Sequence, residues 1–162
     1  RVIRADYGDV TVICVYIPSG EAEGPKYEYK MEFLEDFLEW IKELRKERPN
    51  IVVCGDYNIA HKPIDINNWK RQVGVSGFLP EERAWLDRWE ESGMVDTFRM
   101  FDQSAEKYSW WSFRAASRAR NVGWRIDYHW VSEPMKGRVT DAKILNEVVH
   151  SDHCPVSIEV RG

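Results

Sequence analysis

The stretch IVVCGDYNIAH, residues 51–61, joins an apolar run to a short polar segment, and the rest of the chain can be interpreted outward from it. Its first four residues are apolar and mostly branched at Cβ, which predicts a short, fully buried strand. Asp56 and Asn58 follow at the point where this strand ends. An acid and an amide at such a point either form a turn or supply ligands for a cation and a phosphate.

Two further elements precede this stretch and place it in a sheet. VTVICVYIP, residues 10–18, is rich in β-branched residues and predicts a strand that ends in a loop. Residues 29–47 predict an amphipathic helix that ends before Pro49, because apolar side chains recur with helical spacing. These side chains are Met31, Leu34, Leu38, Ile41 and Leu44. We therefore expect residues 50–56 to return beside residues 10–18 in one sheet.

The remainder of the chain predicts one more helix and then a series of short strands. Residues 61–79 combine Pro, Gly and Asn with little periodicity and predict an ordered loop. LPEERAWLDRWEESG, residues 79–93, carries helix start and stop signals in Pro80, two early acids and Gly93. The predicted strands that follow are MVDTF (94–98), YSWWSF (108–113), WRIDYHWV (124–131), RVTDAKIL (138–145) and CPVSIEV (154–160). This order predicts a mixed α/β fold with sheets covered by helices.

Length, composition and charge narrow the class of protein. A chain of 162 residues suffices for one real core, so residues 1–162 are predicted to form a single domain. Hydrophobic residues at 43% and aromatic residues at 13% indicate a packed protein rather than a disordered one. The formal net charge of −4 argues against indiscriminate coating of nucleic acid, although a local basic patch can still bind phosphates.

The cysteines and the hydropathy pattern bear on location. Cys14, Cys54 and Cys154 form no C-x-x-C pair and each lies beside apolar residues, so we expect buried free thiols in a reducing compartment. No apolar run approaches membrane-spanning length and no cleavable signal is visible. We therefore expect an intracellular protein that has no membrane partner.

Two further acidic motifs lie far from Asp56 in the sequence. Asp127 lies within WRIDY, and Asp152 precedes His153 in HSDHCP. Taken singly, such residues are more often turn formers or surface groups than functional ones. Alternation along WRIDYHWV, however, places Asp127 on the polar face of its strand, where it can orient a histidine and keep it charged. We identify His153 as the candidate partner.

Attack of water on a phosphodiester requires these residue types together. A carboxylate must take the proton of the water, an amide must orient the water, and hard oxygen ligands must hold Mg²⁺ on the phosphate. A cationic imidazole must stabilise the developing charge. The acids, the amide and the histidine named above supply this set, whereas zinc-ligand spacing and a Gly-rich phosphate loop are absent.

A basic and aromatic segment, YSWWSFRAASRARNVGWR, spans residues 108–125. It fits a core strand followed by a solvated arginine loop. It fits equally a loop that contacts DNA phosphates while apolar rings line a pocket for a group taken out of the helix. Composition alone leaves both interpretations open.

Six motifs together resemble a known family. They are VYIPSG, GDYNIAH, GFLPEER, YSWWSFR, NVGWRIDY and SDHCPV, in this order. The sequence resembles the exonuclease III family of abasic-site endonucleases, within the endonuclease/exonuclease/phosphatase superfamily, from about Val10 to the C-terminus. GDxN and SDH alone would indicate only the superfamily, whose members also hydrolyse phosphoinositides and sphingomyelin. GFLPEER and the tryptophan- and arginine-rich segment are specific to the abasic-site branch.

The resemblance implies a fold and an activity. The fold is a four-layer α/β sandwich, in which two β-sheets face each other with helices outside, and this chain corresponds to its C-terminal portion. The activity is that of a DNA repair nuclease, an AP endonuclease that uses Mg²⁺, or Mn²⁺, to hydrolyse the phosphodiester 5′ to an abasic site in double-stranded DNA. Additional 3′ exonuclease or 3′ phosphodiesterase activity is an option. The full-length protein would be a monomer in the cytoplasm or nucleoid of a bacterium, or in the nucleus of a eukaryote.

The resemblance also assigns roles to individual residues. The implied catalytic residues are Tyr16, Asp56, Asn58, Asp127 and His153, and the implied metal ligands are Asp56, Asn58 and Asp152. Tyr16 would contact the scissile phosphate, and Asp56 and Asn58 would orient and activate the water. His153, supported by Asp127, would hold the phosphate or act as a base.

A second group of residues would face the DNA. The implied DNA-binding residues are Asn68, Trp110, Arg114, Asn121, Trp124, Arg125 and Ile126. Trp110, Trp124 and Ile126 would wall the pocket for the base-less sugar. Asn68 would steady the catalytic acid, with the adjacent Asn67 as the alternative.

The sequence departs from the family pattern at its start. Members of the family carry an Asn and a metal-binding Glu upstream of the first strand identified above, and this chain begins after both. Two other functions therefore stay open: a phosphatase of lipid or sugar phosphates within the superfamily, and a catalytically incomplete fragment that binds DNA.

Overall fold

The predicted strand–helix–strand unit forms the centre of the computed structural model, which describes residues 1–162. β2 (Val10–Tyr16) and β3 (Asn50–Asp56) pair in parallel, and α1 (Pro25–Glu47) connects them. The helix begins at Pro25, four residues before the predicted start, because the fixed φ of proline suits the first turn of a helix. Tyr16 lies opposite Asp56, so the two strands end at the same sheet edge.

Five strands form the main sheet in the order β1-β2-β3-β7-β4. β7 (Asp127–Ser132) runs antiparallel to β3 and to β4 (Met94–Asp96). The outer strand β1 (Val2–Tyr7) forms a hairpin with β2 and is absent from the sequence prediction. Its side chains are largely exposed and include an Arg–Asp ion pair, so it lacks the apolar run that indicates a buried strand.

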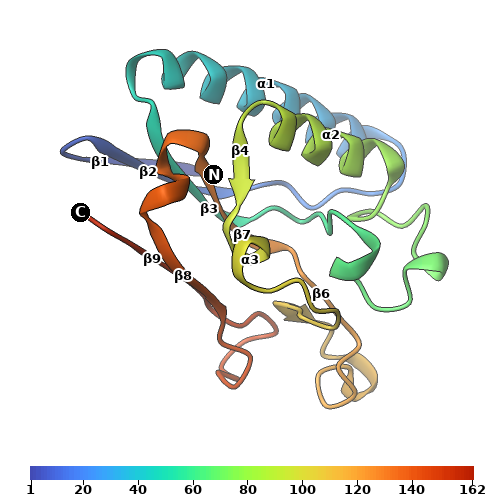
Figure 1. The fold of residues 1–162 in the computed structure, drawn as a ribbon. Helices are drawn as coiled ribbons and strands as arrows, with labels where there is room; N and C mark the ends of the chain where they lie inside the picture. Colours follow the sequence, from blue (N-terminus) through green and yellow to red (C-terminus); the bar gives the residue numbers. More distant parts are fainter.

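Two helices cover one face of this sheet. α1 and α2 (Pro80–Glu91) lie side by side above it in Figure 1. Their apolar faces join the inward side chains of β2, β3 and β7 in the largest hydrophobic cluster, which includes Trp85, Trp89 and Trp130. None of the helices combines the length and the apolarity that crossing a membrane requires.

A second, smaller sheet lies against the opposite face of the main sheet. It consists of β8 (Val139–Ile144) and β9 (Val156–Val160), and a 3₁₀ helix, η4 (Glu133–Arg138), leads into it. A small apolar cluster that includes Val52, Val131 and Val139 joins this hairpin to the main sheet. Helices, a five-stranded sheet and a facing sheet therefore form successive layers (Figure 1).

The tryptophan-rich segment forms a third sheet of two very short strands. β5 (Trp110–Trp111) pairs with β6 (Gly123–Trp124). The predicted strand WRIDYHWV is therefore interrupted after Trp124 and resumes at Asp127. The cause is residue 125, whose backbone N–H donates to the carbonyl oxygen of Asp65 instead of a strand neighbour.

Two other local predictions require correction. The predicted strand 94–98 ends at Asp96, and α3 (Thr97–Phe101) begins there, since the Thr97 hydroxyl donates to the carbonyl oxygen of His129. The predicted loop 61–79 contains two 3₁₀ turns, η1 (Pro63–Asp65) and η2 (Trp69–Arg71).

The expectation of three buried thiols is wrong for one cysteine. Cys14 is exposed, Cys54 is half-buried and Cys154 is buried. β2 alternates between its two faces, so Ile13 and Val15 enter the core beneath the helices while Cys14 points to the opposite face of the sheet.

Candidate active site

Three predicted site residues lie in a row across adjacent strands. Tyr16 at the end of β2 is opposite Asp56 at the end of β3, and Asp56 is opposite Asp127 at the start of β7. Tyr16 is 51% exposed, so its hydroxyl is accessible from solvent. β2 and β3 end, and β7 begins, at the same edge of the sheet. The pairing of the strands alone therefore brings these polar side chains together.

The structure places Asp127 and His153 in contact, as the alternation of β7 predicts. His153 Nδ1 lies 2.9 Å from Asp127 Oδ2 and 3.2 Å from Oδ1. The hydrogen bond to Asp127 raises the pKa of His153 above its usual value, in spite of partial burial. The imidazole therefore stays protonated to higher pH than a free histidine and can donate from its other nitrogen to an anion.

A third residue, Ser109, completes this pair and was missed by sequence reasoning. Its fully buried hydroxyl donates to Asp127 Oδ2 at 2.7 Å. The Ser109 hydroxyl oxygen itself accepts the backbone N–H groups of Ile126 and Asp127. The only signal in the sequence is a small polar residue between aromatic ones in YSWW, which is too common to identify such a role.

Asp56 and Asn58 form a compact turn at the end of β3. The Asn58 backbone N–H donates to Asp56 Oδ1 at 2.8 Å, and the Asn58 side-chain Nδ2 donates to Asp56 Oδ2 at 3.2 Å. Asn58 adopts a left-handed conformation, with φ of 51°. GDYN can therefore form a turn and also supply ligands, because the turn holds the side chains of Asp56 and Asn58 next to each other.

Burial and a neighbouring acid perturb Asp56 strongly. Burial, and then the negative charge of Asp127, raise the pKa of Asp56 to about 6. Contacts with Asn58 and His153 oppose this shift only in part. Two carboxylates this close are a favourable place for a cation, and a strongly shifted acid in a cleft is a typical feature of a functional site.

The side chains at this edge fit a hard divalent cation. Single ligand atoms of Asp56, Asp127 and His153 all lie within 4.8 Å of one another. Carboxylate oxygens are the donors that Mg²⁺ prefers, and Asn58 Oδ1 accepts no hydrogen bond from the protein. A cation here would relieve the repulsion between the two carboxylates.

Asp152, the third predicted metal ligand, lies outside this three-residue cluster. The Trp110 indole N–H donates to Asp152 Oδ2 at 3.0 Å. Although slight burial opposes ionisation, this bond and one from Ser151 hold the pKa of Asp152 below its usual range. Of the predicted metal set, the structure brings Asp56 and Asn58 into direct contact, and Asp152 joins them only through its neighbours His153 and Trp110.

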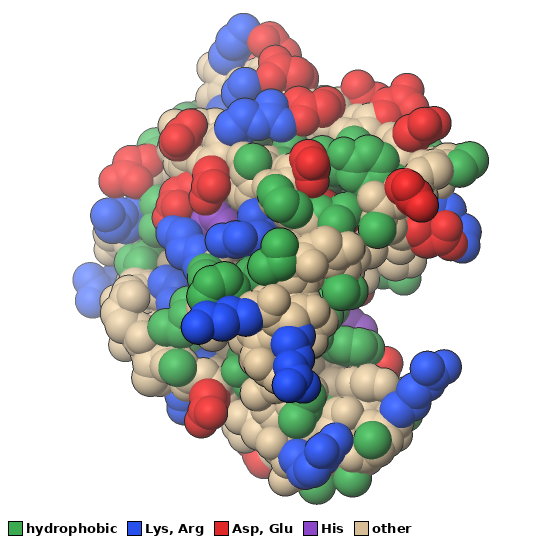
Figure 2. Space-filling model, turned by 90° about the vertical axis from the view of Figure 1, so that its right-hand side faces the viewer, with side chains coloured by type: hydrophobic (Ala, Val, Ile, Leu, Met, Phe, Trp, Pro, Cys, Tyr) green, Lys and Arg blue, Asp and Glu red, His purple; other side chains and the backbone are tan.

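A cleft of about 320 Å³ opens beside the acids. It is lined by Asn58, Val75, Ser76, Gly77, Trp110, Trp124, Ile126 and His153. The rings of Trp110 and Trp124 meet edge to face, with centroids 6.1 Å apart. Figure 2 shows a notch in the surface with a histidine and an acidic side chain inside it and basic side chains on the lobe below. The three predicted pocket residues therefore line one cleft next to His153.

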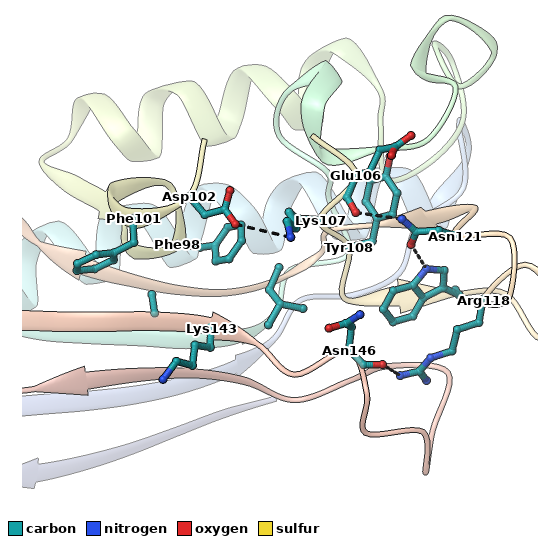
Figure 3. Close-up of a pocket in the computed structure, with 13 residues that line it drawn as sticks. Phe98, Phe101, Asp102, Glu106, Lys107, Tyr108, Arg118, Asn121, Lys143 and Asn146 are labelled. Carbon is teal, nitrogen blue, oxygen red and sulfur yellow. Dashed lines mark hydrogen bonds and ion pairs between the residues drawn. The ribbon is translucent and has the colours of Figure 1, made fainter. Parts of the chain in front are cut away.

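The remaining predicted DNA-binding residues occupy different environments. Asn68 and Arg114 are exposed, and neither side chain forms an ion pair. Asn121 is half-buried and lies in a larger hollow of about 630 Å³, on the opposite side of the β5–β6 hairpin from the cleft. Figure 3 shows its side chain there, accepting from Trp111 Nε1 and donating to the Glu106 carbonyl. This hollow contains none of the site acids.

The structure contradicts the assignment of Arg125 to the DNA-binding surface. Its side chain is only 1% exposed. It forms a bidentate pair with Asp96, at 2.6 and 3.0 Å, and a further bond to Asp65 at 2.8 Å. Without Arg125, Asp96 would be buried with no cationic partner and Asp65 would keep only Arg99, so the Arg125 side chain serves the packing of this region.

Comparisons with known proteins agree with this geometry. Residues 2–153 match the family model described as the Endonuclease/Exonuclease/phosphatase family. The chain is 42% identical over 159 residues to an exodeoxyribonuclease of Bacillus subtilis, and the match covers 98% of this chain and 63% of that protein. It is 35% identical over 159 residues to a DNA repair nuclease of Danio rerio, covering 98% of this chain and 51% of that protein. The chain thus spans only part of the length of these relatives.

Solved structures share the architecture. A 3′ phosphatase from Neisseria bound to a product DNA hairpin superposes with a TM-score of 0.94 at 29% identity, covering 100% of this chain and 65% of that one. An AP endonuclease from Archaeoglobus fulgidus gives a TM-score of 0.91 at 27% identity, covering 99% and 65%. The prediction of an α/β fold with two facing sheets and flanking helices is therefore confirmed.

Proposed function

Because the chain belongs to the endonuclease/exonuclease/phosphatase family, we propose that its protein is a DNA repair nuclease that hydrolyses the backbone 5′ to an abasic site. One observation carries the proposal. The acid–histidine cluster Asp56, Asp127 and His153 opens directly into a cleft walled by Trp110 and Trp124. Cleavage beside a base-less sugar that is displaced from the helix requires hydrolytic groups next to an aromatic pocket.

The chemistry divides among the residues of the sheet edge. Asp56 and Asn58, which are in contact, would hold Mg²⁺, or Mn²⁺, and Asp152, which lies outside their cluster, would be a further ligand; the metal would polarise the phosphate and neutralise developing charge. Asp56 accepts the proton of the attacking water, since an acid with a pKa of about 6 is ionised at neutral pH yet basic enough to act. Asn58, held against Asp56, orients that water.

Two groups act on the phosphate itself. His153, kept protonated by Asp127, donates a hydrogen bond to a phosphate oxygen. The exposed hydroxyl of Tyr16, one strand away from Asp56, contacts the same phosphate. Both stabilise the charge that grows as the P–O bond breaks.

The cleft supplies selectivity for the abasic sugar. Trp110, Trp124 and Ile126 form apolar walls that can pack against the face of a base-less sugar. Arg114, exposed on the adjacent loop, contacts a backbone phosphate, and Asn68 and Asn121 extend this DNA-facing region. Arg125 has no part in it.

The relatives support several finer assignments. An exodeoxyribonuclease, a DNA repair nuclease and a 3′ phosphatase are among the matching proteins, so additional activity on 3′ ends belongs to the proposal. An intracellular location follows from a DNA substrate. We propose that the full-length protein acts as a monomer, because the site residues that this chain supplies come together within one copy of the fold.

Incision of a labelled duplex that contains one abasic-site analogue tests the proposal. We expect cutting 5′ to the site with Mg²⁺, none with EDTA, and none by Asp56→Asn. Asp36→Asn, an exposed acid on α1, is the matched control and should cut like the parent. Cutting by Asp56→Asn, or cutting in EDTA, would contradict the assigned chemistry.

A binding measurement separates the proposal from the DNA-binding alternative. Abasic DNA that is bound by the folded chain in a gel-shift assay, but not cut with Mg²⁺ or Mn²⁺, would indicate a catalytically incomplete binding fragment. Release of phosphate from a soluble inositol phosphate without any DNA cleavage would favour the phosphatase alternative.

A further inference from the structure

A fully buried ion pair lies behind the candidate active site. Lys30 of α1 and Glu82 of α2 have side chains with 0% exposure, and Nζ lies 2.6 Å from Oε1. Burying both charges is costly, and well-packed apolar residues often replace such a pair without loss of stability. A role beyond holding the two helices together would explain why the charges are here.

Lys30 has a second partner in the site. Its ammonium group donates to the carbonyl oxygen of Asn58 at 2.9 Å. Asn58 has φ of 51°, a left-handed conformation that costs free energy for residues other than glycine. This conformation allows Asn58 Nδ2 to reach both Asp56 Oδ2 and the carbonyl oxygen of Ile17. The bond from Lys30 therefore stabilises the backbone geometry that aims the amide.

Glu82 holds the loop that forms the floor of the cleft. Its Oε2 accepts the backbone N–H groups of Gly77 at 2.6 Å and Leu79 at 3.0 Å. Gly77 packs so tightly on the Trp124 ring that an added Cβ would lie 2.7 Å from Cζ3. The Gly77 carbonyl in turn accepts the backbone N–H of Ala60, two residues after Asn58.

We propose that the Lys30–Glu82 pair is a positioning device for the site: it joins the Asn58 carbonyl to the 76–79 loop and so aims the Asn58 amide at Asp56. The pair bridges α1, α2, the end of β3 and the wall of the cleft in one continuous set of bonds. The proposal deepens the proposed nuclease function, and its kinetic consequence rests on that function. Its structural consequence does not.

The decisive variant removes both charges. Lys30→Met has similar length without the ammonium group, and Glu82→Gln keeps one oxygen for the amides of Gly77 and Leu79. The double variant leaves no unpaired buried charge, so it should fold with a melting temperature within about 5 °C of the parent. Lys30→Met alone leaves the Glu82 carboxylate without its cation and should be clearly less stable.

The readout is the conformation of Asn58 in solution. In the parent, the Cα and Cβ chemical shifts and the HN–Hα coupling of Asn58 should report positive φ. In the folded double variant we expect these values to move toward negative φ while the Gly77 signals stay in place. If the parent cuts abasic DNA, kcat should fall by about 10- to 100-fold with KM little changed.

Arg45→Met is the matched control. Arg45 is also a cation on α1 that donates to a backbone carbonyl, that of Ser92, but it lies at the end of α1 away from the site. This variant should lower stability and leave the Asn58 shifts and kcat unchanged. Retention of the left-handed Asn58 signature in the folded double variant would overturn the proposal, whether or not the parent is an active nuclease.

Hydrogen exchange on the parent chain covers the case of a double variant that does not fold. If the pair couples its partners, the amides of Asn58, Gly77 and Leu79 should exchange through one cooperative opening with a common free energy. Clearly different opening free energies for Asn58 and Gly77 would show that the pair does not join them, and the proposal would fail.

Discussion

Asp56 illustrates how a functional residue opposes stability. It is largely buried beside a second carboxylate, and both features disfavour its charged form. The proposed function accounts for an acid at this place, because a carboxylate can both take a proton from water and hold a hard cation. The burial and the neighbouring charge that lower stability at Asp56 are the same features that raise its pKa into the range of a general base.

Asp56→Asn should therefore stabilise the metal-free chain at neutral and alkaline pH. The folded pKa of about 6 lies above the ordinary value of 3.8, so the penalty is absent below pH 3.8 and complete above pH 6. The difference corresponds to up to about 3 kcal/mol. Urea unfolding in EDTA should show this gain at pH 8 and almost none near pH 4. An equal gain at both pH values would mean that charge is not the cause.

Trp124→Ala tests the cleft at the same scale. Removing this wall should let an intact nucleotide enter, so the ratio of cleavage rates for abasic and undamaged duplexes should fall by about tenfold or more. Trp40→Ala, on the solvent side of α1, is the control and should leave the ratio unchanged. An unchanged ratio in Trp124→Ala would remove the ring from the recognition of the site.

At the scale of elements, the parallel pairing of β2 and β3 depends on one glycine. Gly55 has φ of +136°, and an added Cβ would lie 1.9 Å from the carbonyl oxygen of Val15. Gly55→Ala should therefore separate the two strands where Tyr16 and Asp56 meet and cost about 3 kcal/mol or more. Gly137→Ala in η4 meets no atom within 4 Å and should change stability by less than about 0.5 kcal/mol. Chemical denaturation of both variants gives the comparison.

The arginines of residues 108–125 are of two kinds, a buried one that pairs with acids and an exposed one proposed to contact DNA. The sequence pattern does not distinguish them. Arg125→Met leaves Asp96 buried without its cation and Asp65 with Arg99 alone, and should cost about 3–5 kcal/mol. Arg114→Met removes an exposed charge, so stability should stay within about 0.5 kcal/mol while DNA affinity falls and its salt slope decreases by about 1. Thermal melts and salt-dependent DNA titrations measure the two effects. A stable Arg125→Met chain would contradict the structural assignment.

At the scale of the whole molecule, the sequence predicts the elements whose formation depends on neighbouring residues, such as amphipathic helices and buried strands. The unit 10–56 is recognisable because apolar periodicity and strand-end chemistry agree along a continuous stretch. The Asp127–His153 contact is predictable because alternation leaves Asp127 on a polar face. Long-range pairing is not: Lys30 and Glu82 are 52 residues apart, and nothing local distinguishes them from surface charges on amphipathic helices. Arg125 is mistaken for a DNA contact for the same reason.

The strand order has a consequence for how the protein emerges during synthesis. β7 lies between β3 and β4, although it is made after both, so β3 presents an open edge until residue 132 has been translated. His153 reaches Asp127 from a segment that is translated 21 or more residues after β7 has ended. A product that stops before β7 therefore lacks His153 and carries an unpaired edge on β3 that favours aggregation. A cell that makes such a fragment would therefore acquire insoluble protein for its quality control, rather than a soluble fragment that presents Asp56 without Asp127 and His153.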